Sequence, residues 1–418
     1  MKEKIKLGYI GLGRRGRVLL RGHFSKMKDV EVVALCDLSD ERMQKGREYV
    51  VNNGGKEPIL TKNYKDIIND PEIDAVAIMI GWSGRPQIAM EAMRAGKYTA
   101  IEVGCADTLK ECYDLVRTYE ETGTPLMMLE NCCYGRREMM VLNMVKQGLF
   151  GEVVHCTGGY HHYLQEEDLF KNIETNEIPH YRLAHYRDQN RESYPTHELG
   201  PIAKVLNINR GNRFVSLASF SSKSCGIKSY ASERFGADSP YATAEYKQGD
   251  IVTTIINCAN GETITLNLDT TLPRAYYSRN FSVRGTKGMS SEERRVVYLA
   301  GMAEPIENNE EEMFKKYDHP LHAEYAEADV KEGHGGIDWL VCRAFVESVK
   351  AGINTPIDAY DTAAMLAVGP LSEQSIKAGG AVVEFPDFTG GKWKNREPAL
   401  ACKYSLDVIV KDDSISVV

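Results

Sequence analysis

The sequence of 418 residues lacks the features that would assign it to several special classes of protein. It has no run of eighteen apolar residues, so no transmembrane helix is expected. A net charge of −8 argues against nucleic acid or an anionic membrane as the main partner. There is no internal repeat and no low-complexity segment. The opening residues MKEKIKLGYI lack the layout of a signal peptide. We therefore expect a cytoplasmic protein, or an exported one whose leader has been removed.

Metal-binding and disulfide signals are also weak. The ten cysteines include no CxxC pair, and Cys132 and Cys133 are adjacent, which suits neither a disulfide between them nor a pair of zinc ligands. We interpret most cysteines as small buried apolar groups in a reducing compartment. His161 and His162 would point to opposite sides of a strand, so both cannot bind one ion. No metal is expected.

The N-terminal half carries a dinucleotide-binding pattern. A strand-like run at residues 4–10 leads into Gly11-x-Gly13-x-x-Gly16, and a second strand-like run ends in Asp37, about twenty residues later. In this pattern the first glycine allows a tight turn, the second lets the backbone approach a diphosphate, and the third lets the helix pack closely. Asp37 would bind the ribose 2′-hydroxyl and repel a 2′-phosphate, which favours NAD over NADP although Arg14 and Arg15 are basic.

Strands and helices alternate through the rest of this half. Runs 73–80, 98–103 and 125–131 indicate strands, while 86–96 and 108–123 indicate helices. This alternation predicts a doubly wound parallel sheet, the Rossmann class of α/β fold.

After residue 152 the pattern becomes antiparallel. Residues 250–271 form two alternating runs around Asn260-Gly261, a strong hairpin signal. We predict a C-terminal α+β domain with an open, mainly antiparallel sheet, whose free face favours a homodimer or homotetramer. A chain of this length exceeds one ordinary core. The predicted segments are 1–133 for the Rossmann domain, 134–390 for the substrate domain and 391–418 for a tail that packs back.

Histidine and tyrosine gather just after the nucleotide-binding half. Six of the ten histidines lie between His155 and His197. Residues 194–197, YPTH, place Tyr194 and His197 three apart, which puts them on one face of a helical turn. Either residue could be packing, but next to a nicotinamide such a pair suggests proton transfer from an alcohol. Histidine titrates near neutral pH, whereas tyrosine needs a nearby cation such as Arg182 to act as a base.

The sequence resembles the Gfo/Idh/MocA oxidoreductases over nearly its whole length, through GLGRRG, the acid at 37 and AMEAMRAGKY. Longer stretches, among them LMMLENCCYGRREMMVLNMVKQGLFGEVVH, GGYHHYL, YPTHELGPIAKVLNINRG and GHGGID, resemble the branch called glycoside hydrolase family 109, the NAD-dependent α-N-acetylgalactosaminidases. This resemblance implies transient oxidation of the sugar at C3, removal of the C2 proton, elimination of the aglycone, addition of water and re-reduction. The usual pair of catalytic carboxylates is then unnecessary.

The resemblance also implies roles for individual residues. His197 would take the C3-hydroxyl proton and Tyr160 the C2 proton, with the roles open to exchange, and Tyr194 and His162 would complete the catalytic set. Substrate would be bound by Tyr194, His197, Arg182, His334 and Asp338. NAD would be bound by Gly11, Leu12, Gly13, Arg14, Arg15, Gly16, Asp37, Trp82, Glu102 and Asn131.

The chain departs from the family pattern in a few places. Most Gfo/Idh/MocA members have a catalytic lysine in E-K-P after the fifth strand, where this chain has Glu102-Val103-Gly104. Glu198 stands where the family has glycine, which bears on the sugar preference. The alternatives are an ordinary NAD-dependent sugar or inositol dehydrogenase, against which the missing lysine weighs, and a non-catalytic sugar-binding protein.

Overall fold

The computed structural model describes residues 2–171, 180–303, 306–327, 336–399 and 403–410 of the chain. The predicted substrate residue His334 lies outside these residues. The chain divides into two compact units. Unit 1 comprises residues 1–146, 317–364 and 395–418, and unit 2 comprises residues 147–316 and 365–394. Each compact unit is made of several separate segments of the chain, so the units do not test the continuous segments expected from the sequence. Those boundaries remain a prediction.

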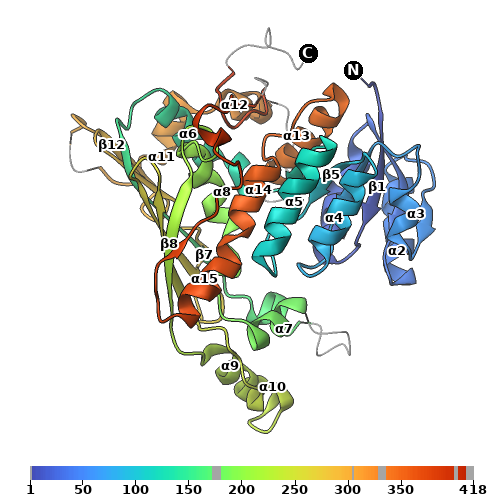
Figure 1. The fold of residues 1–418 in the computed structure, drawn as a ribbon, viewed down its shortest axis with the longest axis horizontal. Coiled ribbons are helices and arrows are strands. Elements are labelled where there is room, and N and C mark those ends of the chain that lie inside the picture. Colours follow the sequence, from blue (N-terminus) through green and yellow to red (C-terminus); the bar gives the residue numbers. More distant parts are fainter. Residues whose placement is uncertain (1, 172–179, 304–305, 328–335, 400–402, 411–418) are drawn as a thin grey trace. The chain divides into compact units, whose positions relative to one another are not determined.

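Unit 1 is built on a six-stranded parallel sheet in the order β3-β2-β1-β4-β5-β6. Strand β1 is buried along almost its whole length, as expected for a strand covered by helices on both faces. Helices α4 and α5 lie side by side against the sheet (Figure 1). The strands are β1 (Ile5–Ile10), β2 (Val30–Cys36), β3 (Ile59–Thr61), β4 (Ala75–Ile78), β5 (Tyr98–Ile101) and β6 (Leu126–Met128).

Helices α2, α3 and α5 of unit 1 begin at residues whose side chains cap them. Thr108 and Glu111 form a reciprocal capping box at the start of α5, and Gly123 ends that helix in a left-handed conformation. The helices are α1 (Arg14–Gly22), α2 (Asp40–Asn52), α3 (Tyr64–Ile68), α4 (Arg85–Arg94), α5 (Leu109–Thr122), the 3-10 helix η2 (Asn131–Tyr134), α6 (Arg136–Lys146), α12 (Pro320–Glu327) and α13 (Ile337–Ala351). Helix α14 (Ala359–Leu366) carries the boundary between the units.

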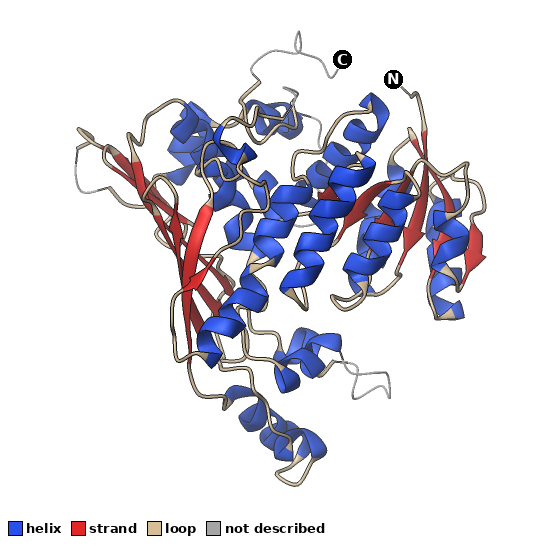
Figure 2. Ribbon diagram, in the orientation of Figure 1, coloured by secondary structure: helices blue, strands red, loops and turns tan. Residues whose placement is uncertain are grey.

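Unit 2 is built on an eight-stranded sheet in the order β13-β12-β11-β7-β10-β9-β8-β14, drawn as one continuous sheet in Figure 2. Of the described neighbours only β7 and β10 run parallel, so the expected mainly antiparallel sheet is confirmed. Its strands are β7 (Val153–His161), β8 (Phe214–Ser221), β9 (Ile251–Cys258), β10 (Thr263–Asp269), β11 (Ser282–Gly285), β12 (Gly288–Ser291), β13 (Val296–Leu299) and β14 (Val383–Glu384).

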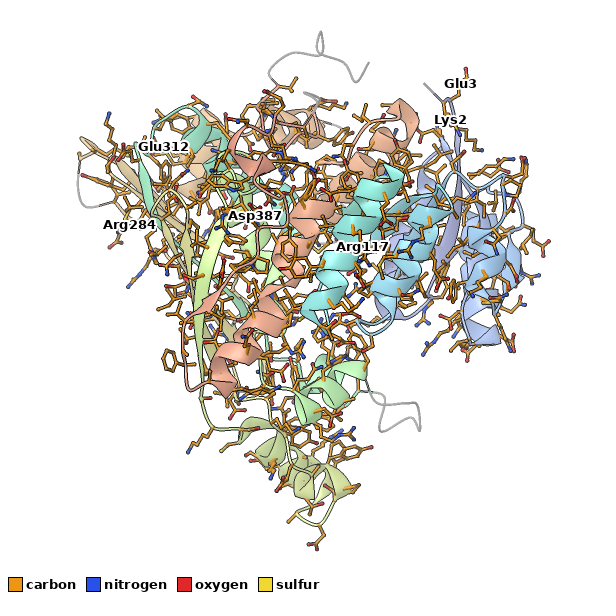
Figure 3. All side chains as sticks on the ribbon, in the orientation of Figure 1. Lys2, Glu3, Arg117, Arg284, Glu312 and Asp387 are labelled. Carbon is orange, nitrogen blue, oxygen red and sulfur yellow. The ribbon has the colours of Figure 1, made fainter. Side chains whose placement is uncertain are left out.

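The predicted hairpin joins β9 to β10, with Gly261 at a φ of 99°. Charged side chains such as Arg284 on β11 and Glu312 on α11 are exposed (Figure 3). The helices of unit 2 are the π-helix η3 (Gln165–Leu169), α7 (Tyr181–Asp188), α8 (Thr196–Val205), α9 (Gly226–Phe235), α10 (Pro240–Thr243), α11 (Glu310–Tyr317), α15 (Val368–Lys377) and the 3-10 helix η5 (Lys392–Lys394). No helix among the described residues has both the length and the apolar character needed to cross a membrane.

Candidate functional site: a nucleotide cradle and a tyrosine–histidine cluster

The glycine motif of unit 1 forms the turn between β1 and α1. Gly11 has a φ of 97°, and a side chain there would collide with the backbone of Met79. A Cβ at Gly16 would collide with the Gly11 carbonyl, so the close packing expected of the third glycine is present. At Gly13, by contrast, a Cβ would meet nothing within 4 Å. Gly13 is also the N-cap of α1, and no side chain caps it. The helix N-terminus therefore faces open space, which suits a diphosphate.

Asp37 follows the carboxyl end of β2. Its Oδ2 accepts a hydrogen bond from the backbone N–H of Leu12 (2.7 Å), and its Oδ1 accepts one from Ser39 (2.9 Å). These bonds fix the carboxylate against the glycine turn, and each oxygen keeps a further lone pair for a ribose hydroxyl. The open N-terminus of α1 and the fixed carboxylate fit NAD, with Gly11, Leu12, Gly13 and Asp37 as the residues that would hold it.

Arg15 is held by acids rather than directed into solvent. Its guanidinium donates two hydrogen bonds of 2.7 Å to the fully buried carboxylate of Asp338 on α13, and its Nε donates to Glu102 at 3.1 Å. Asn131 donates to the same Asp338 at 2.6 Å. Three predicted cofactor residues thus share one network with a residue predicted to bind substrate. Arg14 is exposed.

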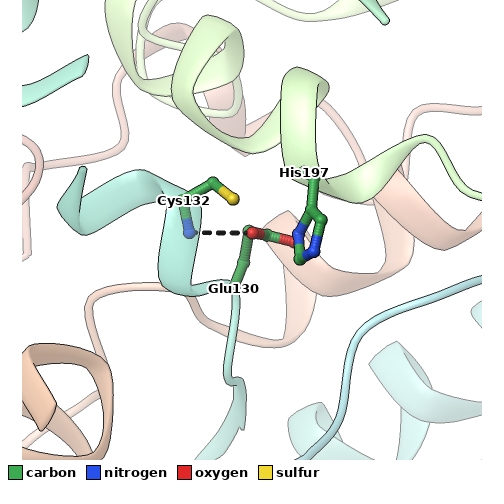
Figure 4. Close-up of side chains that lie close together, drawn as sticks. All are labelled: Glu130, Cys132 and His197. Atoms are coloured by element: carbon green, nitrogen blue, oxygen red, sulfur yellow. Dashed lines mark hydrogen bonds between the residues drawn. The ribbon is translucent and has the colours of Figure 1, made fainter. Parts of the chain in front are cut away.

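The segment at the end of β5 carries the departure from the lysine pattern. Val103 is buried, so an apolar side chain occupies the position of the family lysine. Gly104 has a φ of 137°, and the buried ring of Trp82 lies where its side chain would be. Nearby, the carboxylate of buried Glu130 accepts a hydrogen bond from the backbone N–H of Cys132 at 2.9 Å (Figure 4).

In unit 2, the four predicted catalytic residues gather in one cluster at the end of β7 and the start of α8. Tyr160 and His162 are two apart and share one face of the chain, and the Tyr160 hydroxyl lies 2.9 Å from His162 Nδ1. The rings of Tyr160 and Tyr194 lie 4.3 Å apart between centroids, and those of Tyr160 and His197 lie 5.6 Å apart.

The YPTH segment behaves as its spacing predicts. Pro195, with a φ of −74°, precedes α8, which begins at Thr196. Tyr194 therefore lies just outside the helix and His197 in its first turn. The Tyr194 hydroxyl is 3.5 Å from His197 Nε2, at the long end of a hydrogen bond. The two side chains do face each other.

Arg182 is the cation of the cluster. Its guanidinium carbon lies 4.6 Å from the centre of the Tyr194 ring, a cation–π contact, and the side chain is buried. Burial raises the pKa of the Tyr160 hydroxyl well above its usual range, and the charge and hydrogen bond of Arg182 oppose that rise. Arg182 is itself 3.9 Å from Asp168 on η3.

Two members of this region were not predicted from the sequence. The ring of Tyr277 lies 5.2 Å from that of His162 between centroids. An isolated β-bridge between His161 and Ser278 holds the two segments together. In the sequence, the two adjacent tyrosines Tyr276 and Tyr277 just before a strand were the signal that could have identified Tyr277 as a candidate. Glu192 is fully buried, one of its oxygens accepts from the Tyr194 N–H, and burial raises its pKa to about 8.

Comparison with known proteins agrees with both halves of this description. Residues 134–395 match the family described as Glycosyl hydrolase 109, C-terminal domain, and residues 5–130 match the oxidoreductase family with an NAD-binding Rossmann fold. The α-N-acetylgalactosaminidase of Tannerella forsythia is 38% identical, over 95% of this chain and 89% of its own length. A glycosyl hydrolase family 109 protein of Stenotrophomonas maltophilia is 40% identical, over 96% and 92%.

Solved structures share the fold at low identity. A levoglucosan dehydrogenase in complex with NADH and levoglucosan superposes with a TM-score of 0.67 at 18% identity, over 92% of this chain and all of its own. The myo-inositol 2-dehydrogenase of Lactobacillus plantarum gives a TM-score of 0.61 at 16% identity, over 92% and 100%. The predicted fold class and the NAD-binding domain are thereby confirmed.

Proposed function

We propose a specific reaction for this protein. The chain belongs to glycosyl hydrolase family 109, and it is a glycosidase with an NAD-binding domain. The reaction is removal of an α-linked N-acetylgalactosamine or a related sugar, by transient oxidation at C3 and elimination across C1 and C2. The observation that carries the proposal is the cluster of Tyr160, His162, Tyr194 and His197 around one buried arginine. A relative with that named activity supports the choice of sugar.

The cofactor and the protein divide the chemistry. NAD, when bound, supplies the two-electron oxidation of C3 and its later reversal. His197 takes the proton of the C3 hydroxyl, a task suited to imidazole near neutral pH. The resulting ketone makes the neighbouring C2–H acidic enough for a protein base to remove. The Tyr194 hydroxyl, 3.5 Å from His197 Nε2, holds the imidazole in place.

Tyr160 removes the C2 proton. To act as a base it must first lose its own proton, and burial makes that costly. Arg182 lowers the cost because its positive charge favours the tyrosinate. His162 Nδ1, 2.9 Å from the hydroxyl, can accept the proton. The electrons of the C2–H bond form a C1–C2 double bond as the C1–O bond breaks, and the aglycone oxygen takes a proton from water as it leaves. Water then adds at C1, and a proton returns to C2.

The absence of a lysine at Val103 favours this scheme over an ordinary dehydrogenase, because the base common in that wider family is replaced by a buried apolar side chain. The dehydrogenase remains the second candidate, and one experiment distinguishes the two.

The test is release of nitrophenol from a panel of α- and β-nitrophenyl glycosides, run in D₂O without added NAD. The expected result is cleavage of an α-N-acetylgalactosaminide with deuterium at C2 of the released sugar. Cleavage without deuterium at C2 would contradict the elimination. Reduction of added NAD by free sugars, with no glycoside cleaved, would establish the dehydrogenase instead.

A further inference from the structure

A cavity of about 520 Å³ lies in unit 2 between two short segments of chain. Its volume falls in the range of ~300–1,000 Å³ that is typical of small-molecule sites. None of its lining residues belongs to the tyrosine–histidine cluster. The lining consists of Glu166, Phe170 and Lys171 around η3, and Tyr230, Glu233, Arg234 and Phe235 from α9.

Three of the lining side chains are aromatic, namely Phe170, Tyr230 and Phe235. Phe170 is buried, and its ring stacks on that of Tyr230 at 5.3 Å with an interplanar angle of 23°. Phe235 and Tyr241 pack against Phe170 at 5.4 and 5.7 Å between centroids. Tyr230 and Phe235 remain partly exposed. Aromatic faces carry negative charge density, so they attract the C–H groups on the face of a sugar ring.

The rim of the cavity is charged but balanced. Glu166, Lys171, Glu233 and Arg234 are exposed, and their two negative and two positive charges cancel. A ligand with a strong charge of either sign gains little from such a rim. Carboxylates accept hydrogen bonds and guanidinium and ammonium groups donate them, so vicinal hydroxyls, which do both, match the set.

One stretch of chain connects the lining of the cavity with the cluster. Tyr163 directly follows His162, and its ring lies 6.5 Å from that of Tyr230. An extended chain advances ~3.3 Å per residue, so Tyr163 begins within about 10 Å of Tyr160. On η3, Asp168 pairs with Arg182 of the cluster.

We propose that this cavity binds a neutral sugar residue in the leaving group of an oligosaccharide substrate. The inference rests on the proposed glycosidase function, in which the cleaved sugar is terminal, so that the sugar beside it belongs to the leaving group. The cavity would then select extended glycans over simple glycosides by adding hydrogen bonds to sugar hydroxyls, which an aryl leaving group lacks.

The kinetic test compares two substrates that share the cleaved sugar: its nitrophenyl glycoside, and the same sugar linked to lactose. Tyr230→Ala and Phe235→Ala should raise KM for the lactose conjugate by about tenfold, which corresponds to about 1.4 kcal/mol of lost binding, and should raise KM for the aryl glycoside by less. Glu233→Gln, an exposed change that keeps the fold, should act in the same direction. Phe220→Ala, which removes a 60% exposed ring on β8, is the matched control and should alter neither substrate.

Equal effects of Tyr230→Ala on both substrates, or an equal effect of Phe220→Ala, would overturn the proposal. A calorimetric titration without turnover separates this proposal from the glycosidase function. N-Acetyllactosamine should bind the native protein and the Phe220→Ala variant but bind Tyr230→Ala at least about tenfold more weakly. Digalacturonate should bind more weakly than N-acetyllactosamine. If aryl glycosides are cleaved but N-acetyllactosamine does not bind, the cavity assignment fails and the function stands.

Discussion

The hydroxyl of Tyr160 on β7 lies 2.9 Å from Nδ1 of His162, the first residue after that strand. The Tyr160 side chain is buried and the His162 side chain is half-buried, so the hydrogen bond connects the proposed base to a side chain that is more exposed to solvent. A tyrosine in this position can pass its proton to a group that exchanges with water.

Replacing Tyr160 tests this relationship most directly. Tyr160→Phe keeps the ring that packs 4.3 Å from Tyr194 but removes the hydroxyl, so kcat should fall by at least ~10²-fold, the usual contribution of a general base. Steady-state kinetics on the aryl glycoside measure the loss. Tyr298→Phe on β13 is the matched control. A variant that kept more than a tenth of native kcat would show that the hydroxyl is not the base.

His197 and Tyr160 should block different steps. His197→Gln should prevent oxidation of the sugar, so no absorbance of reduced nicotinamide develops. Tyr160→Phe should allow that absorbance to develop while stopping deuterium exchange at C2. Single-turnover absorbance and NMR of the recovered sugar measure the two steps. The reverse pattern would mean that the two residues exchange roles.

Asp37 should control the choice of dinucleotide. Asp37→Ser removes the carboxylate that accepts from Leu12 and Ser39 and would bind the ribose. We expect NAD to bind about tenfold more weakly, the effect of a lost charge-assisted hydrogen bond, and NADP to gain relative to NAD. Fluorescence titration with each dinucleotide measures both constants. Asp40→Ser, three residues later on the exposed start of α2, is the control, and an unchanged NAD-to-NADP ratio in Asp37→Ser would refute the assignment.

Asp338, predicted to bind substrate, should also matter for stability. It is fully buried and accepts from both Arg15 and Asn131, so Asp338→Ala leaves two donors without their acceptor. The free energy of unfolding should fall by about 3 kcal/mol, at the lower end for broken buried pairs because Arg15 is partly exposed. Urea unfolding measures it. Glu72→Ala breaks the exposed pair with Lys6 and should cost less than about 1 kcal/mol. Equal losses would contradict the structural role.

Glu192 predicts a dependence of stability on pH. Burial raises its pKa from near 4.5 to about 8 in the folded chain, so between these values the unfolded chain is ionised while the folded chain still holds a proton. The contribution of Glu192 to the free energy of unfolding should therefore be greatest below pH 4.5 and should fall as the pH rises toward 8. Glu192→Gln imitates the protonated form and should lessen that fall. Thermal unfolding at pH 5.5 and pH 8 tests this, and an identical fall in both proteins would exclude Glu192 as its source.

The sequence predicted the parts of the fold that depend on local pattern. The alternating strands of unit 1 were recognised because parallel strands read as apolar runs, and the β9–β10 hairpin because Asn260-Gly261 favours its turn. The break between α14 and α15 at Ala367, by contrast, could not be predicted from the sequence. A periodic apolar pattern continues through such a break, so periodicity cannot locate it.

The cluster was only partly predictable for a related reason. Tyr160, Tyr194 and His197 stand in short motifs, whereas Tyr277 reaches His162 through a bridge between distant segments. The burial of Glu192 and the stacking of Arg182 on Tyr194 likewise depend on how the chain packs. Sequence motifs identify the residues that do chemistry, but the charges that adjust their proton affinity come from tertiary contacts.

The parallel pairing of β7 with β10 has a consequence for how the enzyme becomes active. Tyr160 lies opposite Leu268, and every residue of β7 from His155 to His161 depends on a strand that is synthesised more than a hundred residues later. Closing so long a loop has a high entropic cost, and contacts between distant segments slow folding. During synthesis, strand β7, which carries the proposed base, therefore cannot complete its pairing until β10 has been made. We expect a chain truncated before residue 263 to be inactive and to aggregate through the unpaired strand.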